Sequence, residues 1–246
     1  MESFLDILFP KSCSICCRKG TYLCNRCKKL FKKTLPECYK CRRINCNYKT
    51  HNFCKREKDL DAVFVCWEYN SLTSDLLRKY KYGYVYDIDT ALVEFATERI
   101  VESNYMELLE NTLITNIPIS SLRLRERGFN QTYSISKRIS EVFELEFNSA
   151  LIGRKHSIEH QAFKEKDERK HMEEEEFYIS KPQDINNFSS ITIVDDVITT
   201  GTTLENASYC LKKYYGESLI VNAICMFRGK PYYSESSDSE EGVGSS

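Results

Sequence analysis

Cysteines in the first part of the sequence recur at the spacing of metal ligands. Three Cys-x-x-Cys pairs are followed by one His-x-x-Cys pair. Such a pair forms a tight turn that directs two ligand atoms to one metal ion, and two pairs complete a tetrahedral zinc site. Four pairs therefore predict two structural zinc sites, with no ligand position left open for water. The predicted ligands are Cys13, Cys16, Cys24, Cys27, Cys38, Cys41, His51 and Cys54.

The spacing alone does not determine how the four pairs combine. Pairing in order along the chain gives one site with four thiolates and one with three thiolates and an imidazole. An interleaved pairing fits the spacing equally well. Cys17 and Cys46 are left over in either case, although Cys46 could compete with His51. Free or redox-active thiols are the competing interpretation, and four pairs together favour zinc over it.

A second pattern with chemical meaning runs from Ile191 to Leu204, ITIVDDVITTGTTL. A β-branched run leads to two acidic residues, a short turn and a Thr/Gly-rich loop that opens a helix. Backbone N–H groups at a helix start, together with threonine hydroxyls, can surround a phosphate, and a glycine lets the backbone come close to it. The predicted phosphate-binding residues are Thr199, Thr200, Gly201, Thr202 and Thr203.

The two acidic residues of this pattern, Asp195 and Asp196, follow the predicted strand directly. Ligands of open α/β sheets bind at the carboxyl ends of the strands. We therefore predict that these carboxylates accept hydrogen bonds from the hydroxyls of a ribose. The competing interpretation is an ordinary strand-turn-helix with two acids as helix caps, which the sequence Thr-Thr-Gly-Thr-Thr makes less favourable.

Basic residues follow another predicted strand, which contains Pro118. Arg123, Arg125 and Arg127 are therefore expected near the same edge of the sheet, where guanidinium groups suit a pyrophosphate. The amides of Asn130 and Gln131 come next in the sequence. A structural role as caps of the next helix and a role in ligand binding are equally compatible with their position.

These residues must be positioned by strands and helices that alternate along the chain. β-branched and aromatic runs predict strands at 61–69, 112–119, 191–195 and 219–227, and apolar periodicity predicts helices within 73–103 and at 130–144 and 203–215. This alternation predicts an α/β fold, with a parallel sheet flanked by helices. We divide the chain into a zinc-binding segment, 1–60, an α/β domain, 61–230, and a disordered acidic, Ser-rich tail, 231–246.

Charge is distributed unevenly between these parts. Residues 1–60 contain 15 Lys and Arg against 5 Asp and Glu, whereas the whole chain has a net charge of −1. A basic segment on an acidic body suggests a polyanionic partner. Cations beside aromatic faces are typical of single-strand nucleic-acid binding, and a solvated surface is the alternative. The residues concerned are Lys28, Lys29, Lys32, Lys33, Arg42 and Arg43, with Phe31, Tyr39 and Tyr48.

The beginning of the sequence, MESFLDILFPKSC, has no basic leader, no long apolar run and no small-residue cleavage site. These features argue against a signal peptide. No stretch approaches the roughly 18–20 apolar residues of a membrane span. We therefore expect a cytoplasmic protein without a membrane span, in which the paired cysteines are metal ligands rather than disulfides.

The Thr/Gly-rich pattern resembles the loop with which type I phosphoribosyltransferases bind 5-phosphoribosyl-1-diphosphate (PRPP). The chain as a whole, from about Cys13 to Arg228, resembles the ComF competence family. The cysteine pairs and the PRPP loop support this resemblance, as do Leu77–Gly83 (LRKYKYG) and Arg123–Gln131 (RLRERGFNQ). The resemblance implies a double zinc ribbon joined to a phosphoribosyltransferase-like domain.

The resemblance also implies a role in natural transformation. The protein would bind PRPP or a related ribose phosphate with Mg²⁺, and single-stranded DNA through the zinc segment, in association with DNA-uptake or helicase machinery. The alternative is a catalytically active phosphoribosyltransferase that transfers the ribose phosphate to a base or another small nucleophile. The loop is shared by enzymes and by regulators that only bind the ligand, and the sequence shows no base or nucleophile pocket, so activity stays open.

Overall fold

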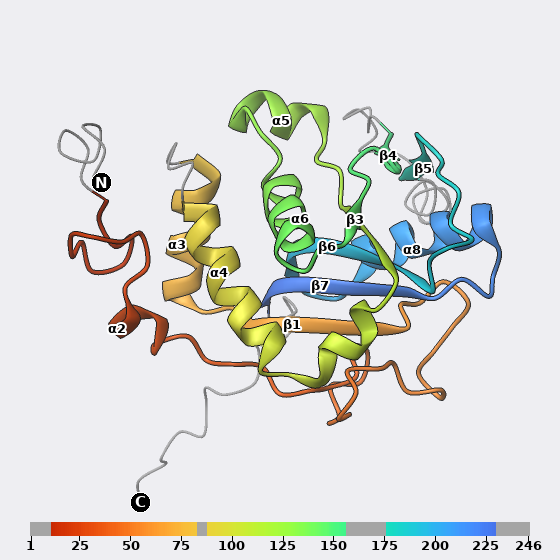
Figure 1. Ribbon diagram of the computed structural model, residues 1–246, viewed down its shortest axis with the longest axis horizontal. Coiled ribbons are helices and arrows are strands. Elements are labelled where there is room, and N and C mark those ends of the chain that lie inside the picture. Colours follow the sequence, from red (N-terminus) through yellow and green to blue (C-terminus); the bar gives the residue numbers. More distant parts are fainter. Residues whose placement is uncertain (1–10, 83–87, 156–175, 230–246) are drawn as a thin grey trace, which may run out of the picture.

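A computed structural model describes residues 11–82, 88–155 and 176–229 (Figure 1). The predicted tail at 231–246 lies outside these described residues. The centre of the fold is a five-stranded parallel sheet with the strand order β1-β7-β6-β2-β3. The predicted α/β class, with a parallel sheet flanked by helices, is therefore confirmed. The strands are β1 (Ala62–Glu68), β2 (Thr112–Asn116), β3 (Glu146–Phe147), β6 (Ser190–Ile198) and β7 (Val221–Arg228).

Helices cover both faces of this sheet (Figure 1). One face packs against α3, α4, α6 and the 3₁₀ helix η1, and the other packs against α8. Both faces of β1 and β7 are buried, which explains why these strands are mainly apolar runs rather than alternating sequences. The helices are α2 (Asn25–Lys28), α3 (Ser71–Tyr82), α4 (Ile88–Val101), η1 (Asn104–Leu109), α5 (Ser121–Arg127), α6 (Gln131–Val142) and α8 (Thr202–Tyr215).

Several elements differ from the sequence-based expectation. The strand predicted at 112–119 ends at Asn116, two residues before Pro118, and β6 continues to Ile198 rather than ending at Asp195. Helix α5 was not predicted, because Ser121–Arg127 has no apolar face; it begins after the cap Ser120 and ends at Gly128 in a left-handed conformation. The short antiparallel pair β4 (Ile152–Arg154) and β5 (Phe177–Ile179) was also missed.

The N-terminal segment lies along the β1 edge of the sheet. Lys33 forms an antiparallel bridge with Trp67, and Lys49 forms one with Ala62. The segment contributes to both hydrophobic cores, because Phe31 packs with the α3 and α4 side and Tyr39 packs with the α8 side. The cysteine-rich segment and the α/β domain are therefore packed together over a common apolar interior.

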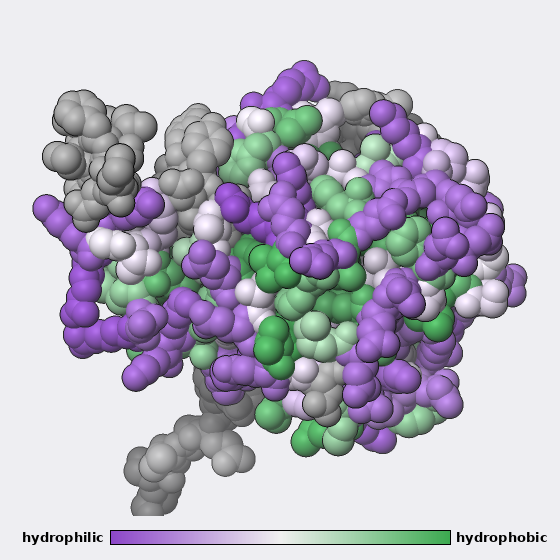
Figure 2. Space-filling view, viewed as in Figure 1, coloured by the Kyte–Doolittle hydropathy of each residue, from purple (hydrophilic) through white to green (hydrophobic). Residues whose placement is uncertain are grey.

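The face of the molecule seen in Figure 2 carries hydrophobic side chains over α4 and α6. These helices and η1 bear the exposed residues Val101, Val142 and Met106. Among the described helices, none combines the length and the apolar character that crossing a membrane requires.

Candidate functional site

The four cysteine-containing pairs combine in order along the chain. Two groups of four ligand atoms form, and within each group all atoms lie within 4.8 Å of one another. The structure thus decides between the two pairings that the sequence left open. Cys46 is exposed and belongs to neither group, so His51 is the fourth ligand of the second. The first cluster consists of Cys13, Cys16, Cys24 and Cys27, and the second of Cys38, Cys41, His51 and Cys54.

Both clusters have the dimensions of a zinc site. Zinc–sulfur bonds of about 2.3 Å in a tetrahedron place neighbouring sulfur atoms about 3.8 Å apart. The Sγ atoms of Cys16 and Cys24 are separated by 3.6 Å, and Cys41 Sγ lies 3.3 Å from His51 Nδ1. Four thiolates, or three thiolates and an imidazole, are the donor sets that structural zinc takes. Both clusters can hold a zinc ion.

The thiolate form of Cys13, which a metal requires, is already favoured by the surrounding backbone. Burial opposes ionisation of this thiol, but backbone N–H groups of Cys16, Cys24 and Ile15 outweigh burial and lower its pKa to about 6. One of these groups, the Cys24 N–H, lies 3.5 Å from the sulfur. Hydrogen bonds to the charged form have this effect generally.

The threonine-rich loop joins β6 to α8 at the carboxyl edge of the sheet. Gly201 precedes the helix with φ = 97°, a conformation that glycine adopts at low cost. Among the described residues no side chain caps α8, whereas Ser120 caps α5 and Asn130 caps α6. The Thr202 N–H donates to Thr200 Oγ1 at a long 3.5 Å, and the N–H groups that follow at such a helix start can bind an external acceptor. Asp195 and residues 197–204 line a small cavity of about 30 Å³ here.

The hydroxyl groups of this loop lie close together. Thr200 Oγ1 and Thr202 Oγ1 are 3.0 Å apart, and Thr199, Thr200 and Thr202 are exposed. On the other side of the loop, Gly229 donates its N–H to Ile198 O at 2.8 Å. A Cβ atom at Gly229 would meet the Thr199 methyl group at 2.6 Å, so a larger residue there would force the Thr199 side chain to move.

The two aspartates differ in environment. Asp195 is buried, and its carboxylate accepts the N–H of Asp196 at 2.8 Å. Burial, together with the negative charge of Asp196, raises the pKa of Asp195 to about 8. Asp196 is more exposed and forms an ion pair with Lys81. A carboxylate has two oxygens with about four acceptor sites, so this ion pair leaves room for a hydroxyl donor.

Lys81 was not predicted as a site residue, although it lies in the quoted segment LRKYKYG. Its neighbour Tyr80 donates a hydrogen bond to Gln131 O at 3.2 Å and packs against Phe129 with ring centroids 5.9 Å apart. Two of the segments that carried the family resemblance therefore meet at the carboxyl edge of the sheet. The sequence feature that could have identified Lys81 as a site residue is the basic-aromatic segment LRKYKYG, which ends in glycine.

The predicted arginines lie on α5, at the top of Figure 1, which follows β2. Asp195 lies within β6, the strand that pairs with β2, and the threonine loop follows the end of β6 at Ile198. Arg123 and Arg125 are exposed, and Arg127 donates to Gln131 Oε1 at 3.3 Å. The side-chain oxygen of Asn130 accepts the Thr132 N–H and so caps α6. Of the two roles compatible with the sequence, helix capping and ligand binding, the structure shows helix capping for Asn130.

Comparison with known proteins adds an independent observation. No family model matches the chain. The chain is 26% identical over 204 residues to competence protein F of Haemophilus influenzae (strain ATCC 51907 / DSM 11121 / KW20 / Rd), a match that covers 81% of this chain and 88% of the relative. The chain is similar to competence protein F over most of its length. The resemblance to the ComF family noted from the motifs is thereby confirmed.

The basic residues of the N-terminal segment have a different arrangement from the one predicted. Lys28 pairs with Glu98 at 3.0 Å and Lys33 with Glu102 at 2.5 Å, so both serve as contacts to α4 and the turn after it. Lys32 pairs with Glu68 at 2.9 Å. The aromatic residues predicted to stack on bases, Phe31, Tyr39 and Tyr48, are buried, and that prediction is wrong. Arg26, Lys29 and Arg43 are exposed.

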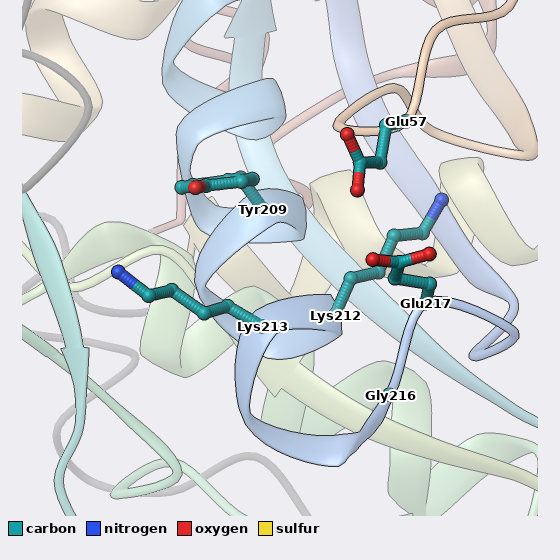
Figure 3. Close-up of a pocket in the computed structure, with 6 residues that line it drawn as sticks. All are labelled: Glu57, Tyr209, Lys212, Lys213, Gly216 and Glu217. Atoms are coloured by element: carbon teal, nitrogen blue, oxygen red, sulfur yellow. The ribbon is translucent and has the colours of Figure 1, made fainter.

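A larger pocket, of about 310 Å³, lies at the other end of α8 (Figure 3). Its lining on α8 begins at Tyr209, which lies about 10 Å along the helix axis from Thr202 at 1.5 Å per residue. Lys212 and Lys213 leave the helix in different directions in this view. Lys212 has a structural role, because its Nζ donates a hydrogen bond to Asp59 O at 2.7 Å. The lining residues are Glu57, Tyr209, Lys212, Lys213, Gly216 and Glu217.

Proposed function

We propose that this protein binds PRPP or a related ribose phosphate at the loop between β6 and α8, and that it takes part in natural transformation as a ComF-like protein. The observation that carries the proposal is the loop itself. An uncapped helix start, clustered threonine hydroxyls and a glycine in a left-handed conformation form a cradle for a phosphate. Two carboxyl groups precede this cradle on the same strand.

The chemistry of the cradle favours a sugar phosphate over free phosphate. Backbone dipoles at the start of α8 attract a dianion, while the Asp196 carboxylate would repel one placed directly against it. A ribose between the two parts resolves this conflict, because its hydroxyls donate to oxygens of the two aspartates while its phosphate accepts from the loop. Mg²⁺ would accompany the diphosphate of PRPP. The arginines of α5 follow β2, the strand next to β6, and could contact this diphosphate from that side.

The role in transformation is supported by the homology to competence protein F. We propose that the cysteine-rich segment holds two zinc ions and contributes to single-stranded DNA binding. The exposed Arg26, Lys29 and Arg43 are among the cations that could contact phosphates, whereas Lys28, Lys32 and Lys33 are paired with acids. We expect no stacking from the buried aromatic residues of this segment.

Calorimetric titration with PRPP·Mg²⁺ tests the first part of the proposal. The wild type should bind with 1:1 stoichiometry, and Asp196→Asn should bind more weakly by about tenfold, the effect of losing a hydrogen bond to a charged group. Asp75→Asn, an exposed acid on α3, is the matched control and should leave the affinity unchanged. If PRPP does not bind, or if both variants behave alike, the proposed site is wrong.

Fluorescence anisotropy with a labelled single-stranded oligonucleotide tests the second part. Arg26→Glu combined with Lys29→Glu should weaken binding and reduce its salt dependence, since each phosphate contact contributes a slope of about 0.7 for single strands. Lys213→Glu, on the far end of α8, is the control. Equal oligonucleotide binding by the two variants excludes this surface.

Pyrophosphate release from PRPP over a panel of bases, lost in Asp196→Asn, would instead establish the alternative, an active phosphoribosyltransferase.

A further inference from the structure

The turn between Cys38 and Cys41, the first two ligands of the second cluster, packs directly on the phosphate loop. Tyr39 and Lys40 are the two residues that separate Cys38 from Cys41. The Tyr39 ring lies so close to Gly201 that a methyl group at this glycine would meet two ring carbons at 3.0 and 3.2 Å. The Tyr39 hydroxyl donates to Glu205 Oε1 at 3.1 Å, in the first turn of α8. The metal-binding segment thus forms one wall of the loop.

Glu205 introduces a negative charge beside the proposed phosphate site. Its carboxylate is nearly buried, and Oε1 would lie 3.5 Å from a methyl group on Gly201. Asp59, fully buried, adds a second acid nearby. Two uncompensated carboxylates at this end of α8 would oppose the binding of any phosphate, because like charges repel strongly where water is excluded.

Lys40 compensates both acids. Its Nζ lies 2.8 Å from Asp59 Oδ1 and 2.9 Å from Glu205 Oε1, and the side chain is only 23% exposed. Two carboxylates that face one ammonium group stabilise its charge in this half-buried position.

The turn is fixed from a second direction by the end of β7. Arg228 is buried and donates to Glu37 Oε1 at 2.8 Å and to Tyr39 O at 3.3 Å. Arg228 pairs in register with Ile198, the last residue of β6 before the threonine loop. The turn therefore sits over the carboxyl ends of β6 and β7, where its own metal ligands hold it closed.

The geometry points to a function for the second cluster beyond folding the N-terminal segment: it is part of the phosphate site. Tyr39 and Lys40 are positioning residues, and Lys40 in particular neutralises Glu205 so that a phosphate can bind at the start of α8. This inference rests on the proposed function, and it adds that metal occupancy of the second cluster and PRPP binding are thermodynamically coupled.

Titration of the zinc-loaded, full-length protein with PRPP·Mg²⁺ tests this inference through four variants. Lys40→Gln should weaken binding by about tenfold or more, as expected for an uncompensated charge beside the ligand, and Lys40→Arg should stay within about threefold of the wild type. Combining Lys40→Gln with Glu205→Gln should restore a large part of the binding, because the acid beside Gly201 is gone and only the charge of Asp59 stays uncompensated. Lys213→Gln, an exposed lysine on the same helix, is the control.

The coupling is also measured from the metal side. Because linkage is reciprocal, PRPP·Mg²⁺ should strengthen zinc binding at the second cluster. Saturating PRPP·Mg²⁺ should therefore slow the transfer of one of the two zinc ions to a zinc-selective chromophore in the wild type. The slowing should be smaller in Lys40→Gln. A purely structural role for Lys40 predicts that the double variant is worse than the single one, which would overturn the inference. Wild-type affinity in Lys40→Gln would overturn it while leaving the proposed function intact. Absence of PRPP binding by the wild type would overturn both.

Discussion

Replacing Asp195 by Asn should stabilise the protein, and the stabilisation should grow with pH. The pKa of this carboxyl is raised from 3.8 to about 8 in the folded protein, because it is buried next to Asp196. Between these values the unfolded chain has lost the proton that the folded protein still holds. Rising pH then favours unfolding, and the loss of stability is complete above pH 8.

The size of this effect follows from the pKa difference. Each pH unit between 3.8 and about 8 costs the wild type about 1.4 kcal/mol relative to a side chain that does not titrate. Between pH 5.5 and 7.5 the free energy of unfolding of Asp195→Asn should therefore rise by about 3 kcal/mol relative to the wild type. In a chain of this size, such a change corresponds to roughly 6–12 °C in melting temperature.

Urea unfolding of ligand-free, zinc-loaded protein at several pH values measures this difference. Asn is isosteric with Asp and its carbonyl oxygen can still accept the Asp196 N–H, so packing should be preserved. Asp184→Asn, an exposed acid, should show no comparable pH trend. A stability difference between Asp195→Asn and the wild type that stays constant to within about 0.5 kcal/mol from pH 5.5 to 7.5 would refute the reasoning.

Two further predictions concern the metal clusters and the phosphate loop. Metal analysis should find two zinc ions per chain in the wild type and in Cys46→Ser, but about one in His51→Ala; loss of zinc in Cys46→Ser would contradict the ligand assignment. Gly201→Ala should lower the free energy of unfolding by about 1–3 kcal/mol through backbone strain, and by more than Gly216→Ala, since only Gly201 has the Tyr39 ring in the way; equal losses in chemical denaturation would argue against that contact.

Local patterns in the sequence predicted the main elements well, because the sheet is buried. Strands such as β1 and β7 are continuous apolar runs that need no knowledge of their neighbours. The predicted segment at 219–227 corresponds to β7, Val221–Arg228. The short strands β3 to β5 have two or three residues each, too few to show any periodicity, and they could not be recognised.

The candidate site was less predictable, because it depends on contacts between distant residues. Tyr39 and Glu205 are 166 residues apart in sequence, and nothing in either local pattern indicates that they touch. Counting charges suggested that Lys28 and Lys33 were available for nucleic acid, but their partners Glu98 and Glu102 become neighbours only after folding. The ligand sets of the two metal clusters likewise required the three-dimensional path of the chain.

The position of β7 in the sheet has a consequence for synthesis of the chain on the ribosome. β1 is made early, but it pairs with β7, whose residues are about 160 positions later. Until β7 is inserted, β1 and β6 each present an unpaired apolar edge, which favours aggregation in nascent chains. A chain arrested before Val221 would also lack Arg228, and with it the contact between the metal-binding turn and the sheet. Premature termination should therefore yield aggregated fragments in which the two metal clusters form but the α/β domain does not fold.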